Sequence, residues 1–137
     1  MSHSAIALLG FVSWTLLLLL MIGGTRAGLV LTGKRAANQF NPDGKDVSPF
    51  SNRLCRAHAN CYENLPLFAA VILLALVMGR NGVTDPLALW FLGARVAQSV
   101  THLISTSHNA VLVRFAFFAV QIAILVYWLF RLFAFSA

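Results

Sequence analysis

Four long apolar stretches dominate this chain and direct it to the membrane. A bilayer core about 30 Å thick requires roughly 20 apolar residues in a helix, and we predict four such spans. They cover about residues 5–35, 53–79, 86–104 and 110–134. Of the 137 residues, 59% are hydrophobic and 10% are charged, whereas soluble domains carry about a quarter charged residues. The sequence therefore predicts an all-α, multi-pass integral membrane protein with a single domain over residues 1–137.

The distribution of charge predicts the orientation of the four spans. Six of the ten Lys and Arg residues lie between Arg26 and Arg56, and cytoplasmic loops are enriched in these residues. We therefore expect the first loop to lie in the cytoplasm and both termini to lie outside. The net charge of +6 does not indicate nucleic acid as a partner, because no basic stripe is interleaved with exposed aromatic residues.

Local signals predict where the spans begin and end. The first span lacks a basic leader and a cleavage pattern, so we expect it to be retained and to continue to Arg35. Asp85 followed by Pro86 is typical of a helix start, with Asp85 as the N-cap. Three residues of the last span are expected to anchor the outer interface: Tyr127, Trp128 and Arg131.

A polar stripe marks the beginning of the second span. Its members follow the i, i+3, i+4 spacing of one helix face, within an arc of about 100°: Arg53, Arg56, Asn60, Glu63 and Asn64. Arginines at a membrane surface often extend to lipid headgroups, which would explain Arg53. That explanation fails for Glu63 and Asn64, which lie about three turns deeper. Ionisable groups at such depth normally face a bundle interior or a wet cavity, so the stripe favours a binding site.

The third and fourth spans carry polar groups at the same depth. One face of the third span is expected to hold Arg95, Gln98, Ser99, His102 and Thr106. The fourth span places Arg114 near its cytoplasmic end and Gln121 two turns deeper. Four arginines at membrane depth face one carboxylate, that of Glu63, and surplus guanidinium groups call for an anion. A carboxylate-bearing peptide, a phosphate headgroup and a fatty acid all fit, and some of the arginines could instead reach lipid phosphate.

The cysteines and histidines do not indicate a metal site. Cys55 and Cys61 lie six residues apart on one predicted helix and point in different directions, so they cannot form a disulfide with each other. Neither has the spacing of a metal ligand, and the four histidines are scattered. His58 points away from the stripe and is expected to pack between helices. We therefore expect no metal.

The stripe resembles the second-helix signature of a known family. The run Arg56-Ala57-His58-x-Asn60-x-x-Glu63-Asn64-x-Pro66-x-Phe68 is similar to that of the MAPEG family, the membrane-associated proteins in eicosanoid and glutathione metabolism. The chain looks like a bacterial-type member resembling the microsomal glutathione transferases and the leukotriene-C synthase. The resemblance covers essentially the whole chain. It implies an antiparallel four-helix bundle that assembles as a homotrimer, with three intramembrane sites between subunits.

The resemblance also implies a ligand and roles for individual residues. Family enzymes bind glutathione, as a co-substrate, in a folded shape near the cytoplasmic face. By match to the motif, Arg56, Asn60 and Glu63 would hold its carboxylates and amine, and Arg114 would stabilise its thiolate as the catalytic residue. The complete candidate binding set is Lys34, Arg35, Arg53, Arg56, Asn60, Glu63, Asn64, Arg95, Gln98 and His102. The thiolate would attack a lipophilic electrophile or reduce a lipid hydroperoxide.

Three departures from the family pattern leave a second reading open. Gln98 and His102 stand where family enzymes often carry a tyrosine or histidine and then a tyrosine, and Phe118 replaces a further tyrosine. These changes remove hydroxyl groups that could contact peptide or thiol. The alternative is a non-enzymatic membrane protein of the same fold that binds lipids or fatty acids. In either case we expect a multi-pass protein, in the inner or cell membrane if the source is bacterial.

Overall fold

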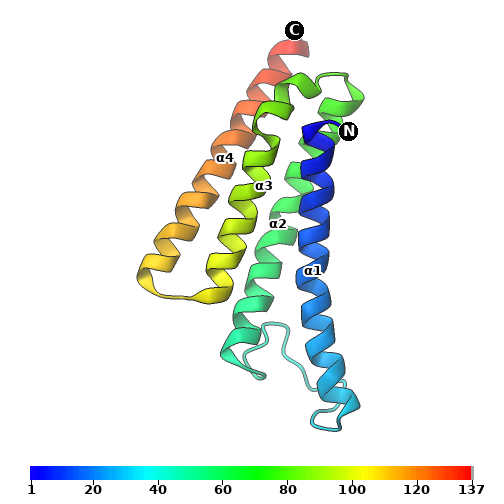
Figure 1. Ribbon diagram of the computed structural model, residues 1–137, viewed down its shortest axis with the longest axis vertical. Helices are drawn as coiled ribbons and strands as arrows, with labels where there is room; N and C mark the ends of the chain where they lie inside the picture. Colours follow the sequence, from blue (N-terminus) through cyan, green and yellow to red (C-terminus); the bar gives the residue numbers. More distant parts are fainter. Residues whose placement is uncertain (137) are drawn as a thin grey trace.

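Four long helices form the whole architecture of the computed structural model, which describes residues 1–136. They are α1 (His3–Leu31), α2 (Pro49–Val77), α3 (Asn81–Ile104) and α4 (His108–Ser136) (Figure 1). Each is long and apolar enough to cross a membrane. The prediction of an all-α, four-span membrane protein is confirmed.

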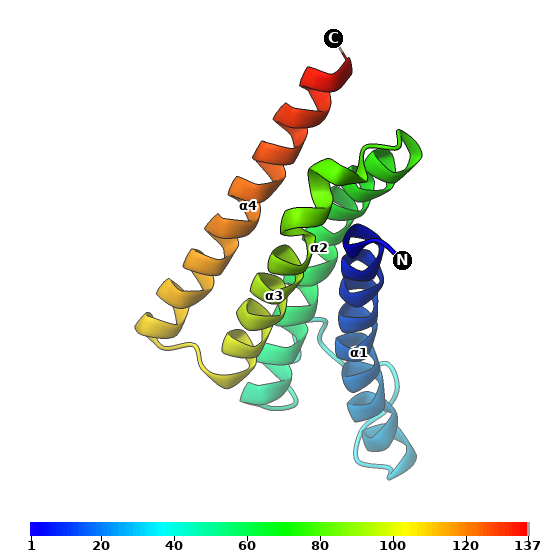
Figure 2. The same ribbon diagram turned by 45° about the horizontal axis from the view of Figure 1, so that its top comes forward.

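The helices run alternately up and down, so both chain termini and the α2–α3 turn lie at one end of the bundle (Figure 1). The first loop and the α3–α4 loop lie at the other end. Helix α3 is central and packs against the other three helices. Helix α4 packs mainly on α3, touches α2 only slightly, and diverges from the bundle when seen from above (Figure 2). The narrow α2–α4 contact leaves room for cavities between these two helices.

Two glycines end α1 and α2 in the same way. Gly33 and Gly79 both have a positive φ, 72° and 66°, a conformation that glycine adopts without steric cost. After α1, the amides of Gly33 and Lys34 donate to the carbonyls of Val30 and Leu29, the double bond pattern that closes many helix ends. Helix α1 therefore ends at Leu31, and the expected continuation to residue 35 is wrong.

The starts of α2 and α3 also differ from the predictions. Helix α2 begins at Pro49 rather than Arg53, because the Ser48 side chain caps it and proline occupies the first helical position. Helix α3 begins at Asn81, so Asp85 and Pro86 lie inside it. The predicted N-cap role of Asp85 for its own helix is wrong.

Asp85 instead caps the neighbouring helix. Its carboxylate accepts hydrogen bonds from the backbone N–H of Ser4 at 2.8 Å and from the Ser4 hydroxyl at 2.6 Å. Asn81 donates a third bond at 2.8 Å. The first four N–H groups of a helix lack partners within the helix, and a carboxylate there also meets the positive end of the helix dipole. Asp85 thereby fixes α1 to α3 at the end that holds the termini.

Four aromatic rings fill the centre of the half of the bundle nearest the termini. Phe68 stacks on Phe91 with centroids 4.4 Å apart, and Phe11 and Trp128 lie 5.3 and 6.0 Å from Phe68. One ring comes from each helix, so the cluster joins all four. Trp128 is completely buried, and its predicted place at the outer interface is wrong. Tyr127 and Arg131 remain on the outside of α4, where the Arg131 guanidinium donates to the Tyr127 hydroxyl at 2.8 Å.

Candidate functional site

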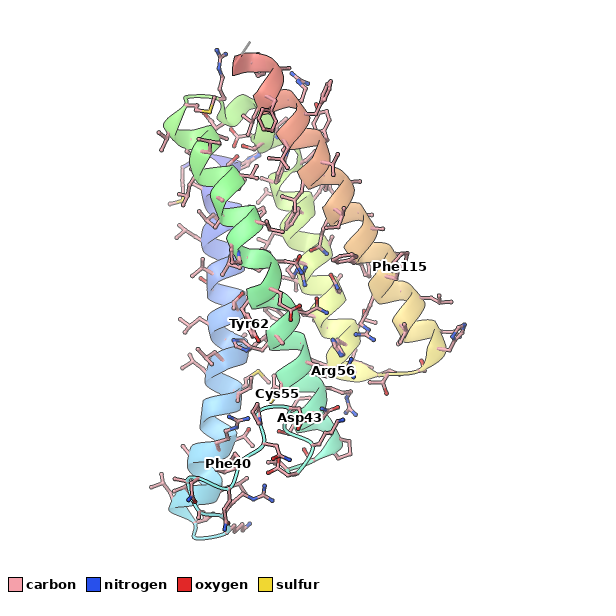
Figure 3. All side chains as sticks on the ribbon, turned by 180° about the vertical axis from the view of Figure 1, so that it is seen from behind. Phe40, Asp43, Cys55, Arg56, Tyr62 and Phe115 are labelled. Carbon is pink, nitrogen blue, oxygen red and sulfur yellow. The ribbon has the colours of Figure 1, made fainter. Side chains whose placement is uncertain are left out.

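A polar cavity opens between α2, α3 and α4 in the half of the bundle near the first loop. Its volume is about 190 Å³, and it is lined by Arg56, Ala59, Asn60, Glu63, His102 and Arg114. Because α2 is helical from Pro49 onward, Arg56, Asn60 and Glu63 succeed one another on its face. Figure 3 shows Arg56 on the side of α2 that faces α3 and α4. The structure therefore brings together three residues of the predicted stripe with one residue each from α3 and α4.

A second, more apolar cavity adjoins the first. Its volume is about 290 Å³, and it is lined by Asn60, Gln98, Val111, Arg114, Phe115 and Phe118. The two cavities share Asn60 and Arg114. Small-molecule sites usually occupy about 300–1,000 Å³, a range that the two joined cavities reach. Arg114 thus lines both the polar cavity and the apolar one. Figure 3 shows Phe115, a residue of the apolar cavity, on α4.

The charges in the polar cavity are not paired with one another. Within the described part of the chain, the one ion pair joins Arg35 to Asp46. The carboxylate of Glu63 and the guanidinium groups of Arg56 and Arg114 thus share a cavity of about 190 Å³ with no N–O contact within 4.0 Å. Two cationic groups and one anionic group are free to bind a ligand.

Buried polar atoms beside the cavities also lack partners. The Nε2 atom of His102 and the Nε atom of Arg114 are inaccessible to solvent and form no hydrogen bond. A buried polar group without a partner costs about 1–3 kcal/mol. These two atoms belong to residues that line the polar cavity.

Gln98 forms a hydrogen bond with Gln121, a residue that the sequence predicts at membrane depth but does not assign to the binding site. Its Oε1 atom accepts a hydrogen bond from the Nε2 atom of Gln121 at 2.8 Å, and the same nitrogen donates to the carbonyl of Phe117. Both glutamines are buried. The pair joins α3 to α4 and fixes one wall of the apolar cavity. In the sequence, the seven-residue spacing between Arg114 and Gln121 places both on one helix face, and this pattern could have identified Gln121.

Several predicted residues lie away from the cavities. The Nε atom of Arg53 donates to the Leu103 carbonyl at 2.8 Å and so satisfies the last turn of α3. Arg35 is held by Asp46 in the first loop, and Lys34 is exposed beside it. Asn64 bonds to the carbonyl of Asn60 in its own helix. Thr106 lies beyond the end of α3 and is exposed, so the prediction that it shares the helical face is wrong.

Arg95 lies in the core of the bundle. Its residue is 1% exposed, and its guanidinium carbon lies 5.6 Å from the ring centroid of Phe11. All three guanidinium nitrogens lack a hydrogen-bond partner. Nearby, the Cys61 thiol and the Ser99 hydroxyl are 3.3 Å apart and connect α2 to α3. Arg95 lines neither cavity, because the central position of α3 turns this residue toward α1 and α2.

The two cysteines do not form a disulfide with each other, in agreement with the prediction from their spacing. Both Cys55 and Cys61 are buried and unbridged. His58 lies on the α1 side of α2, with its ring 5.3 Å from that of Tyr62. In the part of the chain that the structure describes, no three His, Cys, Asp or Glu side chains gather as a metal site would require.

Comparison with known families agrees with this geometry. The family model that matches is that of the MAPEG family, over residues 4–134. The chain belongs to the MAPEG family. No curated protein and no solved structure shows a significant match. The resemblance seen in the second span is therefore confirmed at the level of the family. Membership in the MAPEG family supports a glutathione-related membrane activity in general terms.

Proposed function

We propose that this MAPEG protein is a membrane-embedded, glutathione-dependent transferase or peroxidase that acts on lipophilic electrophiles or lipid hydroperoxides. In this proposal Arg56, Asn60 and Glu63 bind the peptide in the polar cavity. His102 and Gln98 complete the wall from α3, and Arg114 faces the thiol. The remaining candidates, Lys34, Arg35, Arg53, Asn64 and Arg95, line neither cavity and are given no contact with the peptide.

The observation that carries the proposal is the set of unpaired charges in the polar cavity. Glutathione has two carboxylates and one ammonium group. The cavity offers the guanidinium of Arg56 for a carboxylate, the carboxylate of Glu63 for the ammonium and the guanidinium of Arg114 for the thiolate. Guanidinium groups match carboxylates in a two-bond geometry, and the Glu63 carboxylate matches an ammonium. The donor set thus fits a zwitterionic peptide better than a fatty acid, which has no group for Glu63.

The second cavity supports the chemistry. Glutathione, when bound, supplies a thiol nucleophile. Arg114 lines both cavities, so its guanidinium can stabilise the thiolate at their junction by favouring the charged form. Val111, Phe115 and Phe118 offer an apolar surface where a hydrophobic substrate can be held. Phe115 and Val111 are largely exposed on α4, so such a substrate can arrive from the lipid.

An activity measurement tests the proposal. The purified protein in mild detergent is incubated with glutathione and either 1-chloro-2,4-dinitrobenzene or a fatty-acid hydroperoxide. Conjugation or reduction above the uncatalysed rate is expected, together with loss of activity in Arg114→Ala. The absence of both activities, although glutathione is bound, would contradict the catalytic part of the proposal.

One observation favours the alternative of a non-enzymatic lipid-binding protein. None of the described residues that line the two cavities carries a hydroxyl group, because Gln98, His102 and Phe118 stand where family enzymes have tyrosines or histidine. In that case Arg56 and Arg114 hold the headgroup or carboxylate of a lipid. Binding of a fatty acid in the cavities, without any binding of glutathione, would decide for this alternative.

We further propose a homotrimer, in which a neighbouring subunit covers the open face of the cavities. Arg56 and Glu63 are exposed in the single chain, and unpaired charges in a membrane require cover by protein or ligand. Native mass spectrometry in mild detergent should give the trimer mass. Monomers alone would contradict both the trimer and a site shared between subunits.

The same account places the first loop in the cytoplasm. Six of the ten Lys and Arg residues lie between Arg26 and Arg56, in the loop and the helix ends beside it, and the polar cavity lies in the adjoining half of the bundle. A reporter fused to the C-terminus should be active outside the cytoplasm. Activity restricted to the cytoplasm would reverse the orientation.

A further inference from the structure

Two arginines gather at the end of the bundle that holds the termini, far from the polar cavity. Arg80 follows α2, and its guanidinium carbon lies 4.6 Å from the ring centroid of Phe135 on α4. The guanidinium carbon of Arg131 lies 5.6 Å from the same ring. Both side chains line one hollow of about 220 Å³, together with Gly79, Gly82, Val83 and Phe135. The Phe135 ring therefore lies close to two positively charged guanidinium groups.

No acidic side chain neutralises this pair. The sequence has four acidic residues, Asp43, Asp46, Glu63 and Asp85. The first two lie in the loop at the opposite end of the bundle, and Glu63 lines the polar cavity. Asp85 is at the same end as the arginines, but its oxygens are bonded to Ser4 and Asn81. Arg131 donates one hydrogen bond to the Tyr127 hydroxyl, and its other N–H groups, together with those of Arg80, are available for an anion.

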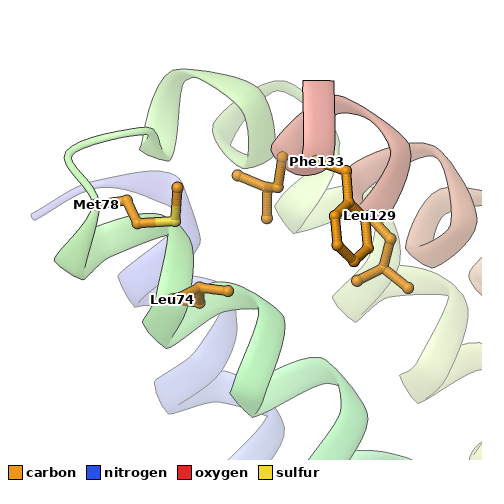
Figure 4. A pocket seen from close by; sticks show the side chains of 5 residues that line it. Leu74, Met78, Leu129 and Phe133 are labelled. Atoms are coloured by element: carbon orange, nitrogen blue, oxygen red, sulfur yellow. The ribbon is translucent and has the colours of Figure 1, made fainter. Parts of the chain in front are cut away.

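An apolar groove lies beside the arginine pair. It runs between α2 and α4, has a volume of about 210 Å³, and is lined by Leu74, Met78, Leu129, Leu132 and Phe133 (Figure 4). Every lining side chain is apolar. The groove and the arginine pair lie at the same end of α2 and α4, with Met78 two residues before Arg80 and Leu132 directly after Arg131, although no residue lines both hollows.

We propose that this end of the molecule binds one anionic glycerophospholipid. Its phosphodiester lies between Arg80 and Arg131, and one acyl chain occupies the groove below. Charge complementarity identifies the headgroup, since guanidinium groups form charge-assisted hydrogen bonds with phosphate oxygens. The groove selects a lipid over free phosphate, because only a lipid brings a hydrocarbon chain to the apolar surface. Because the apolar helix α2 ends at Val77, we expect the Arg80 side chain to reach the lipid headgroups. This site is independent of the proposed glutathione cavity.

Native mass spectrometry tests the proposal with the full chain in mild detergent. Dioleoyl phosphatidylglycerol and dioleoyl phosphatidylcholine are titrated separately, and bound lipids are counted. Wild-type protein should retain phosphatidylglycerol in preference to phosphatidylcholine. The double variant Arg80→Gln/Arg131→Gln should lose about tenfold or more in phosphatidylglycerol affinity, since each basic residue near a membrane surface contributes roughly fivefold. The matched control Arg26→Gln/Lys45→Gln removes the same charge at the opposite end and should bind as wild type.

A second pair of variants tests the groove. Leu74→Trp fills the groove. Leu73→Trp places the same ring at a neighbouring residue that does not line the groove and is 51% exposed, against 50% for Leu74. Leu74→Trp should lower phosphatidylglycerol retention severalfold, and Leu73→Trp should not. Equal retention of both lipids by wild type, an equal loss in the control, or unaltered binding by Leu74→Trp would overturn the proposal. Displacement by millimolar inorganic phosphate would reduce the site to a simple anion site. Dissociation of an oligomer by Leu74→Trp alone would instead assign the groove to a second copy of the chain.

Discussion

Glu63 of α2 and Arg114 of α4 line one cavity of about 190 Å³ and yet form no ion pair. At membrane depth, opposite charges so close would gain from direct contact, because the low dielectric strengthens their attraction. Their separation leaves both groups available to a third molecule that carries charges of both signs. We interpret Glu63 and Arg114 as two residues of the polar cavity that contact a bound peptide.

Replacement of Glu63 tests its role as the ammonium acceptor. Glu63→Gln preserves size and removes the only carboxylate among the cavity residues. Glutathione affinity should fall by about 1.5–3 kcal/mol, the range for hydrogen bonds to charged groups. Calorimetric titration measures the change, and Asp43→Asn removes a carboxylate outside the cavity as a matched control. Unchanged affinity in a folded Glu63→Gln variant would remove Glu63 from the site.

Replacement of Arg114 distinguishes an effect on the chemical step from an effect on glutathione binding. Arg114→Ala should lower kcat more than it raises KM, because stabilisation of the thiolate matters chiefly in the transition state. The ultraviolet absorbance of the bound thiolate should fall in parallel. Arg114→Lys keeps the charge and loses the planar fork, so partial activity is expected if the role is mainly electrostatic. An Arg114→Ala protein with full kcat would exclude the assigned role.

The buried guanidinium of Arg95 leads to a prediction about stability. Burial of a charge without a partner is costly, and replacement by an apolar side chain of similar volume is often neutral or stabilising. Arg95→Met should therefore keep or raise the thermal unfolding temperature in detergent, whereas Arg95→Ala should lower it by leaving a void. Glutathione affinity should not change, because Arg95 lines neither cavity. A marked loss of stability in Arg95→Met would mean that the guanidinium has a partner, such as a bound anion.

The spans and the stripe on α2 could be predicted from the sequence, because both follow from helical periodicity within one segment. Arg56, Asn60 and Glu63 share a helix face, and the structure places them in one cavity. Helix ends were less predictable. Ser48 and Pro49 start α2 four residues before the predicted start of the span at Arg53, and Asp85, predicted to cap its own helix, caps α1. Periodicity within one helix carries no information about a partner 81 residues away.

Helical spacing also could not predict the surroundings of the polar residues on α3. Arg95, Gln98 and His102 share a face by spacing, but α3 lies at the centre of the bundle and its buried sides meet three different neighbours. His102 therefore lines the polar cavity and Gln98 the apolar one, whereas Arg95 lies against Phe11. The position of α3 among the other helices decides these surroundings, and it depends on packing rather than on local pattern.

Asp85 should matter for stability through α1. Asp85→Ala leaves the Ser4 amide without its acceptor and leaves the Ser4 hydroxyl with Thr84 alone, at an expected cost of about 1.5–3 kcal/mol in the free energy of unfolding. Asp43→Ala removes a carboxylate that accepts a local bond from the Lys45 amide, and should cost about 0.5 kcal/mol or less. Thermal unfolding of both variants provides the comparison. Equal effects would show that Asp85 does not fix α1 to α3.

The central claim, that the cavity of Arg56, Glu63 and Arg114 binds glutathione, is tested most directly by calorimetric titration of the detergent-purified wild-type protein with glutathione. The account predicts saturable binding that weakens in Glu63→Gln and persists in Arg95→Met. No heat of binding at millimolar glutathione, from protein shown to be folded, would contradict it.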